Sequence, residues 1–141
     1  MRSNQLHADH LREEFSPANL ERMRQLRFQM DQLELHWALF SFHNLESNLI
    51  GPCGGVYELY EGSEVIYISA IPEGVHIRDA LNAHFWGQDG LPLGQYLALE
   101  CIDRWRDFQV RFLPSGNARD DARLLLRYYQ LNHKGQAPPF N

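Results

Sequence analysis

Apolar residues recur at helical spacing in the first regular segment of the chain, residues 17–33. Ser16 and Pro17 are a start signal, because serine caps helix N-termini and proline at the first helical position forgoes no hydrogen bond. An apolar stripe follows at three- to seven-residue steps through Leu20, Met23, Met30, Leu33 and Trp37. Three arginines lie largely off this stripe: Arg22, Arg24 and Arg27. The pattern predicts a helix over about 17–33, and we expect its stripe to pack on the protein's own core rather than on a partner.

Alternation typical of β-strands follows a loop-like stretch at 43–54. Residues 55–60 and 65–68 are rich in valine, isoleucine and tyrosine, and Glu61-Gly62-Ser63 between them supplies a turn, so we predict a hairpin. Residues 108–113 alternate apolar with polar and predict a third strand. Helical patterns cover 77–85, 96–105 and 118–131, whereas the glycine-rich stretch 86–95 and the proline-containing end 136–141 predict a loop and an extended tail.

This order of elements predicts an α+β fold. A hairpin plus one late strand makes a small three-stranded antiparallel sheet, and helices flank it. We place the sheet in a domain over residues 51–141 and interpret residues 1–50 as an N-terminal helical extension.

Size and composition limit the class of protein. The chain has 141 residues, of which 44% are hydrophobic and 22% charged, so it is one globular domain rather than a disordered chain. No apolar run is long enough for a membrane helix and the N-terminus lacks the apolar stretch of a signal peptide, so we expect a cytoplasmic protein with no membrane partner. Cys53 and Cys101 make no disulfide scaffold or zinc site and are expected to be buried, and His7 with His10 lacks a third ligand nearby.

The net charge of −5 conceals an uneven distribution. Residues 51–103 hold one arginine against eight acidic residues, whereas residues 104–141 hold six arginines and one lysine against three aspartates. Arg119, Arg123 and Arg127 are spaced by four and form one stripe of a helix. We take them as candidate contacts to nucleic-acid phosphates, with an ordinary solvated face as the alternative.

Four ordered motifs resemble those of the GIY-YIG nuclease domain over about residues 52–141. They are Gly55-Val56-Tyr57, then Tyr67-Ile68-Ser69, then a helix ending in His84-Phe85, and last a helix with Leu124-Leu125-Leu126 that runs into Pro138-Pro139-Phe140-Asn141. The resemblance implies hydrolysis of a DNA phosphodiester with one divalent metal, Mg²⁺ or Mn²⁺. It implies that Tyr57 acts on the attacking water, that Tyr67 and a helix arginine support the scissile phosphate, and that Asn141 orients the site. The candidate catalytic set is Tyr57, Tyr67, Arg78, His84 and Asn141.

Two departures from the family pattern remove essential groups. The position of the family arginine holds Ala80, with Arg78 two residues away, whereas Ser69 in place of the glycine of the second motif is a mild change. The metal-binding glutamate of the family falls on Arg127, or on Tyr129 when counted back from Asn141. Neither side chain binds a cation, so we name no metal ligand.

Three hypotheses follow from these residues. The first is a nuclease fold with a degenerate active site, non-catalytic and without a cofactor, that binds nucleic acid such as DNA or a protein partner. The alternative is an active metal-dependent endonuclease with a rearranged site. The third is another small α+β domain, in which Tyr57 and Tyr67 are packing residues facing each other across a hairpin.

Overall fold

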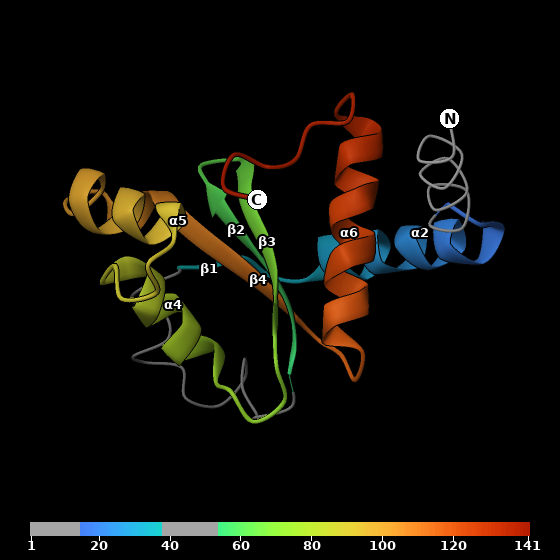
Figure 1. Ribbon diagram of the computed structural model, residues 1–141, viewed down its shortest axis with the longest axis horizontal. Helices are drawn as coiled ribbons and strands as arrows, with labels where there is room; N and C mark the ends of the chain where they lie inside the picture. The colour runs from blue at the N-terminus through green and yellow to red at the C-terminus, as the bar shows by residue number, and fades with distance from the viewer. Residues whose placement is uncertain (1–14, 38–53) are drawn as a thin grey trace, which may run out of the picture.

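An antiparallel sheet with helices on both faces forms the centre of the protein, as the computed structural model of residues 15–37 and 54–141 shows (Figure 1). The strands are β1 (His36–Trp37), β2 (Gly55–Glu61), β3 (Glu64–Ile71) and β4 (Phe108–Pro114). The helices are α2 (Pro17–Gln32), α4 (Ile77–Phe85), α5 (Pro92–Gln95), the π-helix η1 (Tyr96–Glu100), the 3₁₀ turn η2 (Trp105–Asp107) and α6 (Ala118–Asn132). The predicted α+β class is confirmed.

The sheet has the order β1-β4-β2-β3. The predicted hairpin is formed by β2 and β3, which are joined at Gly62, whose φ of +61° suits glycine at the first position of a two-residue loop. The late strand β4 pairs with the other side of β2, where a Cβ at position 55 would overlap the Leu113 carbonyl oxygen, so Gly55 permits the close approach. The strand β1 is a two-residue addition, and it holds Trp37, which the sequence pattern wrongly assigned to the helical stripe.

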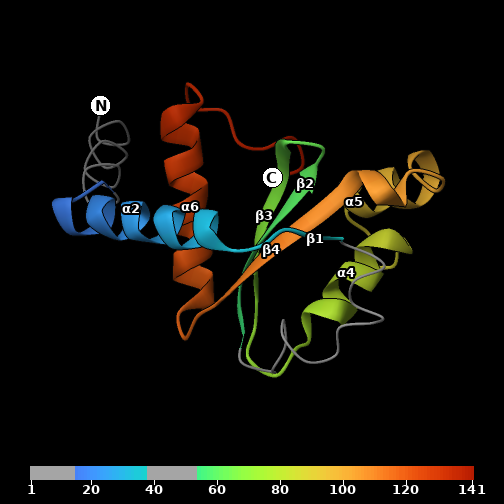
Figure 2. The ribbon, with the colours of Figure 1, turned by 180° about the vertical axis from the view of Figure 1, so that it is seen from behind.

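The two sides of the sheet carry separate cores (Figures 1 and 2). We call the side covered by α4, α5 and η1 the α4 face; its buried residues include Tyr57, Ile77, Leu81, Phe85 and Phe108. We call the side covered by α2 and α6 the α6 face; its buried residues include Met23, Leu26, Met30, Val56 and Leu125. Because successive strand residues point to opposite sides, neighbours in β2 belong to different cores.

The helix α2 confirms its predicted span and its docking on the core. Ser16 Oγ accepts a hydrogen bond from the Asn19 amide at 3.3 Å, as an N-cap should. Met23 and Met30 are fully buried, together with Leu26, which the predicted stripe omitted. Of the three arginines off this stripe, Arg22 pairs with Asp121 of α6 and Arg27 pairs with Glu58 of β2.

The chain reverses after α6 and returns to the edge of the sheet. Lys134 and Gly135 have positive φ angles of 56° and 82°, which turn the chain back toward β3. The Phe140 amide then donates to the Ile66 carbonyl at 3.0 Å. The predicted extended tail therefore follows the outer edge of β3.

Several sequence-based expectations need correction, and others concern residues outside those that the structure describes. The predicted loop 86–95 contains the short helix α5. The predicted helix 96–105 is the π-helix η1, followed by non-helical residues up to the start of η2. Cys101 is a buried free thiol, as expected. Cys53, His7, His10 and the loop 43–54 (except Gly54) lie outside the described residues. Within the described part, no helix is both long and apolar enough to cross a membrane.

Candidate functional site

Three of the predicted catalytic residues meet on the α4 face. Tyr57 from β2 and Tyr67 from β3 lie on the same side of the hairpin, because Tyr67 pairs with Leu59, two residues beyond Tyr57. Their ring centroids are 6.1 Å apart. His84 from α4 lies against both, with its ring centroid 5.4 Å from that of Tyr67. The structure therefore brings together the first and second motif tyrosines and the helix histidine.

A hydrogen-bonded chain links Tyr57 to a residue that sequence reasoning missed, Asp89. The Tyr57 hydroxyl lies 2.7 Å from His84 Nε2, and His84 Nδ1 contacts the Asp89 carboxylate. An ionised carboxylate only accepts hydrogen bonds, so Nδ1 carries the ring proton and its N–H donates a hydrogen bond to Asp89. The Tyr57 hydroxyl then donates to Nε2. The sequence placed Asp89 in a glycine-rich loop, with no signal that linked it to His84.

Burial determines the protonation states of Tyr57 and His84. Tyr57 is 2% exposed and His84 5% exposed. Burial, with a contribution from Tyr67, raises the pKa of Tyr57 well above its usual range. Burial also lowers the pKa of His84 from 6.5, although the hydrogen bond to Asp89 opposes the change. Both side chains are therefore neutral near pH 7, and Tyr57 is a hydrogen-bond donor rather than a base.

The other two predicted catalytic residues lie apart from this cluster. Asn141 is bound to the β3 backbone: its Oδ1 accepts from the Ile68 amide at 2.8 Å and its Nδ2 donates to the Ile68 carbonyl at 2.7 Å. It therefore continues the hydrogen bonding of an edge strand. Arg78 is half-buried near the start of α4, and no contact among those described joins it to Tyr57, Tyr67 or His84.

The sheet separates the predicted arginine stripe from the tyrosines. Arg119, Arg123 and Arg127 belong to α6, which covers the α6 face, whereas Tyr57 and His84 lie on the α4 face. Arg119 and Arg123 are exposed; Arg123 pairs with Asp120 at 3.9 Å. Arg127 is half-buried and donates to Gln130 Oε1 at 2.8 Å. A phosphate held by this stripe would therefore not reach Tyr57.

Metal ligands are not gathered in the part of the chain that the structure describes. No group of three histidine, cysteine, aspartate or glutamate side chains lies close enough together there to hold a metal ion. Glu58, beside Tyr57 in sequence, points to the α6 face and is occupied by Arg27. The expected absence of a metal site remains a prediction for the whole chain.

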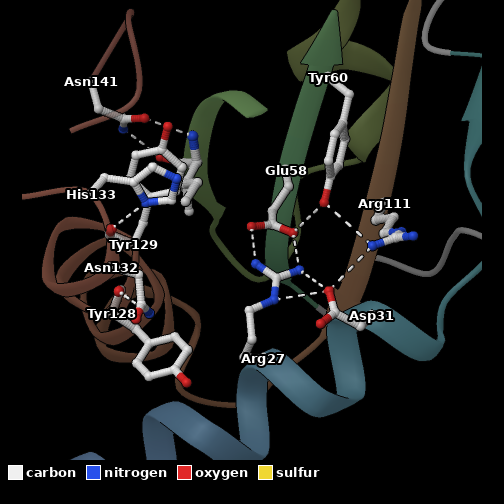
Figure 3. A network of polar contacts seen from close by, with 11 residues as sticks. Arg27, Asp31, Glu58, Tyr60, Arg111, Tyr128, Tyr129, Asn132, His133 and Asn141 are labelled. Atoms are coloured by element: carbon white, nitrogen blue, oxygen red, sulfur yellow. Dashed lines mark hydrogen bonds and ion pairs between the residues drawn. The ribbon is translucent and has the colours of Figure 1, made fainter. Parts of the chain in front are cut away.

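A second polar cluster, which the sequence analysis did not predict, occupies the α6 face (Figure 3). Glu58 is fully buried and forms a two-pronged ion pair with Arg27, both N–O distances being 2.7 Å. The Tyr60 hydroxyl donates to Glu58 at 2.8 Å, and Asp31 accepts from Arg27 at 2.6 Å. Arg111 from β4 contacts Asp31 and the Tyr60 hydroxyl, each at 3.4 Å. We call these five residues the arginine cluster.

The raised pKa values of Arg27 and Tyr60 keep both side chains of the arginine cluster protonated. Burial alone would lower the pKa of Arg27, but the hydrogen bonds and charge of Glu58 more than offset that and raise it. Burial, with the negative charge of Glu58, raises the pKa of Tyr60 to about 12. Tyr60 therefore stays a donor to Glu58 at all physiological pH values. The available sequence signal was a glutamate and a tyrosine on the same side of β2, at positions that a buried strand normally fills with apolar residues.

A pocket of about 660 Å³ opens beside the arginine cluster. Four of the five cluster residues line it, all except the buried Glu58. The opposite wall comes from the last turn of α6 and the residues after it: Tyr128, Tyr129, Asn132 and His133. The hairpin loop Gly62-Ser63 also lines the pocket. The pocket thus places two arginines opposite three aromatic rings.

Comparison with known proteins does not identify a relative. No family model, curated protein or solved structure matches the chain. The resemblance to the GIY-YIG nuclease domain therefore rests on the sequence motifs alone.

Proposed function

We propose that the protein is a GIY-YIG-like domain with a degenerate active site that binds nucleic acid without cleaving it. One observation carries the first half of this proposal: the Tyr57 hydroxyl is enclosed and hydrogen-bonded to His84. A general base must reach the water it activates and be deprotonated near the working pH. Burial that raises the pKa of Tyr57 favours the opposite state.

The charge of α6 supports nucleic acid as the partner. When the motifs are aligned on Leu124-Leu125-Leu126, Arg127 takes the place of the family's metal-binding glutamate, and a fixed cation attracts a phosphate as a bound metal does. Arg119 and Arg123 lie along the same stripe on the solvent-facing side of α6. Basic side chains in such a row follow a phosphate backbone without reading its sequence.

The first test is cleavage. Plasmid and branched DNA are incubated with Mg²⁺ or Mn²⁺ and either the wild type or Tyr57→Phe. We expect no cutting by either protein, because the Tyr57 hydroxyl is enclosed and donates to His84. Cutting by the wild type that Tyr57→Phe abolishes would overturn the non-catalytic half of the proposal, whereas equal cutting by both would indicate a contaminating nuclease.

The second test is binding at low salt. Fluorescence anisotropy is measured with labelled single-stranded, duplex and branched DNA and with RNA. We expect saturable binding that the double variant Arg119→Gln, Arg123→Gln weakens, whereas Arg24→Gln, an exposed arginine elsewhere on the protein, leaves it unchanged. Absence of binding to all of these nucleic acids would contradict the proposal and favour a protein partner.

One observation favours the alternative of an active nuclease. The order Tyr57, His84 and Asp89 is that of a proton relay, in which His84 Nε2 would take the tyrosine proton while Asp89 holds the ring. Substrate would have to open the site first, because Tyr57 is enclosed. In that case His84→Gln would abolish metal-dependent cleavage together with Tyr57→Phe.

A further inference from the structure

We propose that the pocket beside the arginine cluster binds one nucleotide unit, with its phosphate at Arg111 and its base stacked against the aromatic side chains of the opposite wall. The unit is either a free nucleoside monophosphate or an unpaired residue of a single strand. The inference rests on the proposed nucleic-acid function and assigns it a site.

Of the two arginines that line the pocket, Arg111 is the one with N–H donors available for a ligand. Arg27 is saturated, because it makes paired bonds to Glu58 and to Asp31 at 2.6 to 2.9 Å. Both described hydrogen bonds of Arg111 leave from Nη1 and are 3.4 Å long. Its buried Nε has no hydrogen-bond partner among the described residues. A guanidinium offers five N–H donors, so Arg111 can accept a phosphate without losing a strong bond.

The opposite wall suits a planar base. The rings of Tyr129 and His133 are stacked, with centroids 3.7 Å apart and an interplanar angle of 7°. His133 Nδ1 donates to the Tyr129 carbonyl at 2.6 Å, which fixes this ring at the end of α6. Tyr128 lines the same wall, and Tyr60 lies beneath the Arg111 guanidinium, 5.4 Å away. Aromatic side chains stack on any base, whatever its identity.

The volume and the charges of the pocket favour a single nucleotide over a duplex or a free anion. About 660 Å³ lies within the roughly 300–1,000 Å³ range of small-molecule sites and is too small for a duplex. Asp31 and Glu64 also line the pocket, and their negative charges offset the positive charges of the two arginines. A small anion such as free phosphate therefore gains little binding energy there. A ligand that combines one phosphate contact with stacking gains binding energy from both walls of the pocket, the arginine side and the aromatic side. Asp31, whose side chain is half-exposed, would repel the phosphate.

The experiment is isothermal titration calorimetry on the full chain with adenosine 5′-monophosphate, adenosine, inorganic phosphate and a short oligothymidylate. We expect the mononucleotide to bind more tightly than adenosine or phosphate alone. Arg111→Gln should weaken binding about tenfold or more, because it removes a charge-assisted bond. Asp31→Asn should tighten binding about fivefold, because it removes the repulsion.

Two further variants protect the test against a folding defect. His133→Ala alters an exposed residue at the end of α6 and should weaken binding of the mononucleotide by several-fold, through the lost stacking partner. Arg24→Gln removes an exposed arginine of the same helix as Arg27 and Asp31 and should change nothing. A gain of affinity in Asp31→Asn is a result that a merely structural role for the cluster would not produce.

The outcomes separate this inference from the proposed function. Binding of the oligonucleotide that is indifferent to Arg111→Gln, Asp31→Asn and His133→Ala overturns the pocket and leaves nucleic-acid binding to α6. Adenosine or phosphate binding as tightly as the mononucleotide also overturns it. Binding of the mononucleotide without any oligonucleotide supports the pocket as a free-nucleotide site and overturns the proposed nucleic-acid function.

Discussion

Three acidic or imidazole side chains are buried, and each has hydrogen-bond or ion-pair partners: Glu58, His84 and Asp121. Glu58 pairs with Arg27, His84 bonds to Tyr57 and Asp89, and Asp121 pairs with Arg22 at 2.9 Å and accepts from Ser115 at 2.6 Å. A buried charge without a partner is strongly destabilising. In addition to the apolar cores, these contacts therefore join α2 and α4 to β2, and α2 to α6.

The pair Arg27–Glu58 can be tested by removing one charge. Glu58→Gln should lower the free energy of unfolding by about 3 kcal/mol, because Arg27 loses its buried counter-charge. Urea denaturation measures the change. The matched control is Glu21→Gln, whose exposed pair with Arg24 spans 3.7 Å and should contribute at most about 0.5 kcal/mol. Equal effects of the two variants would show that the buried pair has no special role.

The histidine on the α4 face should make stability depend on pH. His84 has its pKa lowered from 6.5 by burial, against the opposing hydrogen bond to Asp89, so as pH falls the unfolded chain binds this proton first. Its contribution is complete above pH 6.5 and is lost as pH falls from there toward the lowered pKa of the folded state. The free energy of unfolding, measured between about pH 5 and pH 8, should decline in acid, and His84→Gln should flatten that decline. An identical pH profile for the variant would argue against the assignment.

At the scale of elements, α2 is part of the fold rather than an appended helix. Its buried residues share one core with β2, β3 and α6. The division at residues 50 and 51 remains a prediction. The contacts of Arg22 with Asp121 and of Arg27 with Glu58 nevertheless join the two sides of that boundary.

Removal of a core side chain of α2 should therefore destabilise the whole domain. Leu26→Ala leaves a cavity at a fully buried position and should cost about 3 kcal/mol in the free energy of unfolding. Phe28→Ala, at a position 67% exposed on the same helix, should stay within about 0.5 kcal/mol of the wild type. Thermal or urea unfolding measures both. A Leu26→Ala protein as stable as Phe28→Ala would mean that α2 docks only loosely.

At the scale of the whole molecule, the sheet keeps two chemistries apart. The neutral tyrosine–histidine chain lies on the α4 face. The arginine cluster (Figure 3), its pocket and the α6 stripe lie on the other face. Nucleic acid bound along α6 would therefore contact the α6 face and leave Tyr57 covered.

Binding along α6 should depend on salt in proportion to the phosphates contacted. The logarithm of the binding constant should fall linearly with the logarithm of salt concentration. Each of Arg119→Gln and Arg123→Gln should reduce that slope by about 1, because each removes one phosphate contact. Arg24→Gln should leave the slope unchanged. Anisotropy titrations at several salt concentrations measure it, and a slope that neither α6 variant alters would place the contacts elsewhere.

Local patterns sufficed for most of the secondary structure. Ser16-Pro17 marked the start of α2, alternation marked β2, β3 and β4, and the turn residue Gly62 marked the hairpin, because capping, period and turn chemistry act between near neighbours in sequence. The short strand β1 and the helix α5 were missed, since two and four residues carry too little periodicity. Tyr57, Tyr67 and His84 were grouped through the family resemblance, and the structure places them in contact.

The sequence by itself determined the order of the longer helices and strands and the α+β class, because these depend on patterns between near neighbours. Only the tertiary structure decided what the individual polar side chains do. Pairing of Leu59 with Tyr67 and the packing of α4 enclosed Tyr57 against His84, and docking of α2 brought Arg27 onto Glu58, 31 positions away in sequence. Burial and the distance between charges set whether a tyrosine is a donor or an arginine can take a ligand, and both depend on contacts between distant parts of the chain.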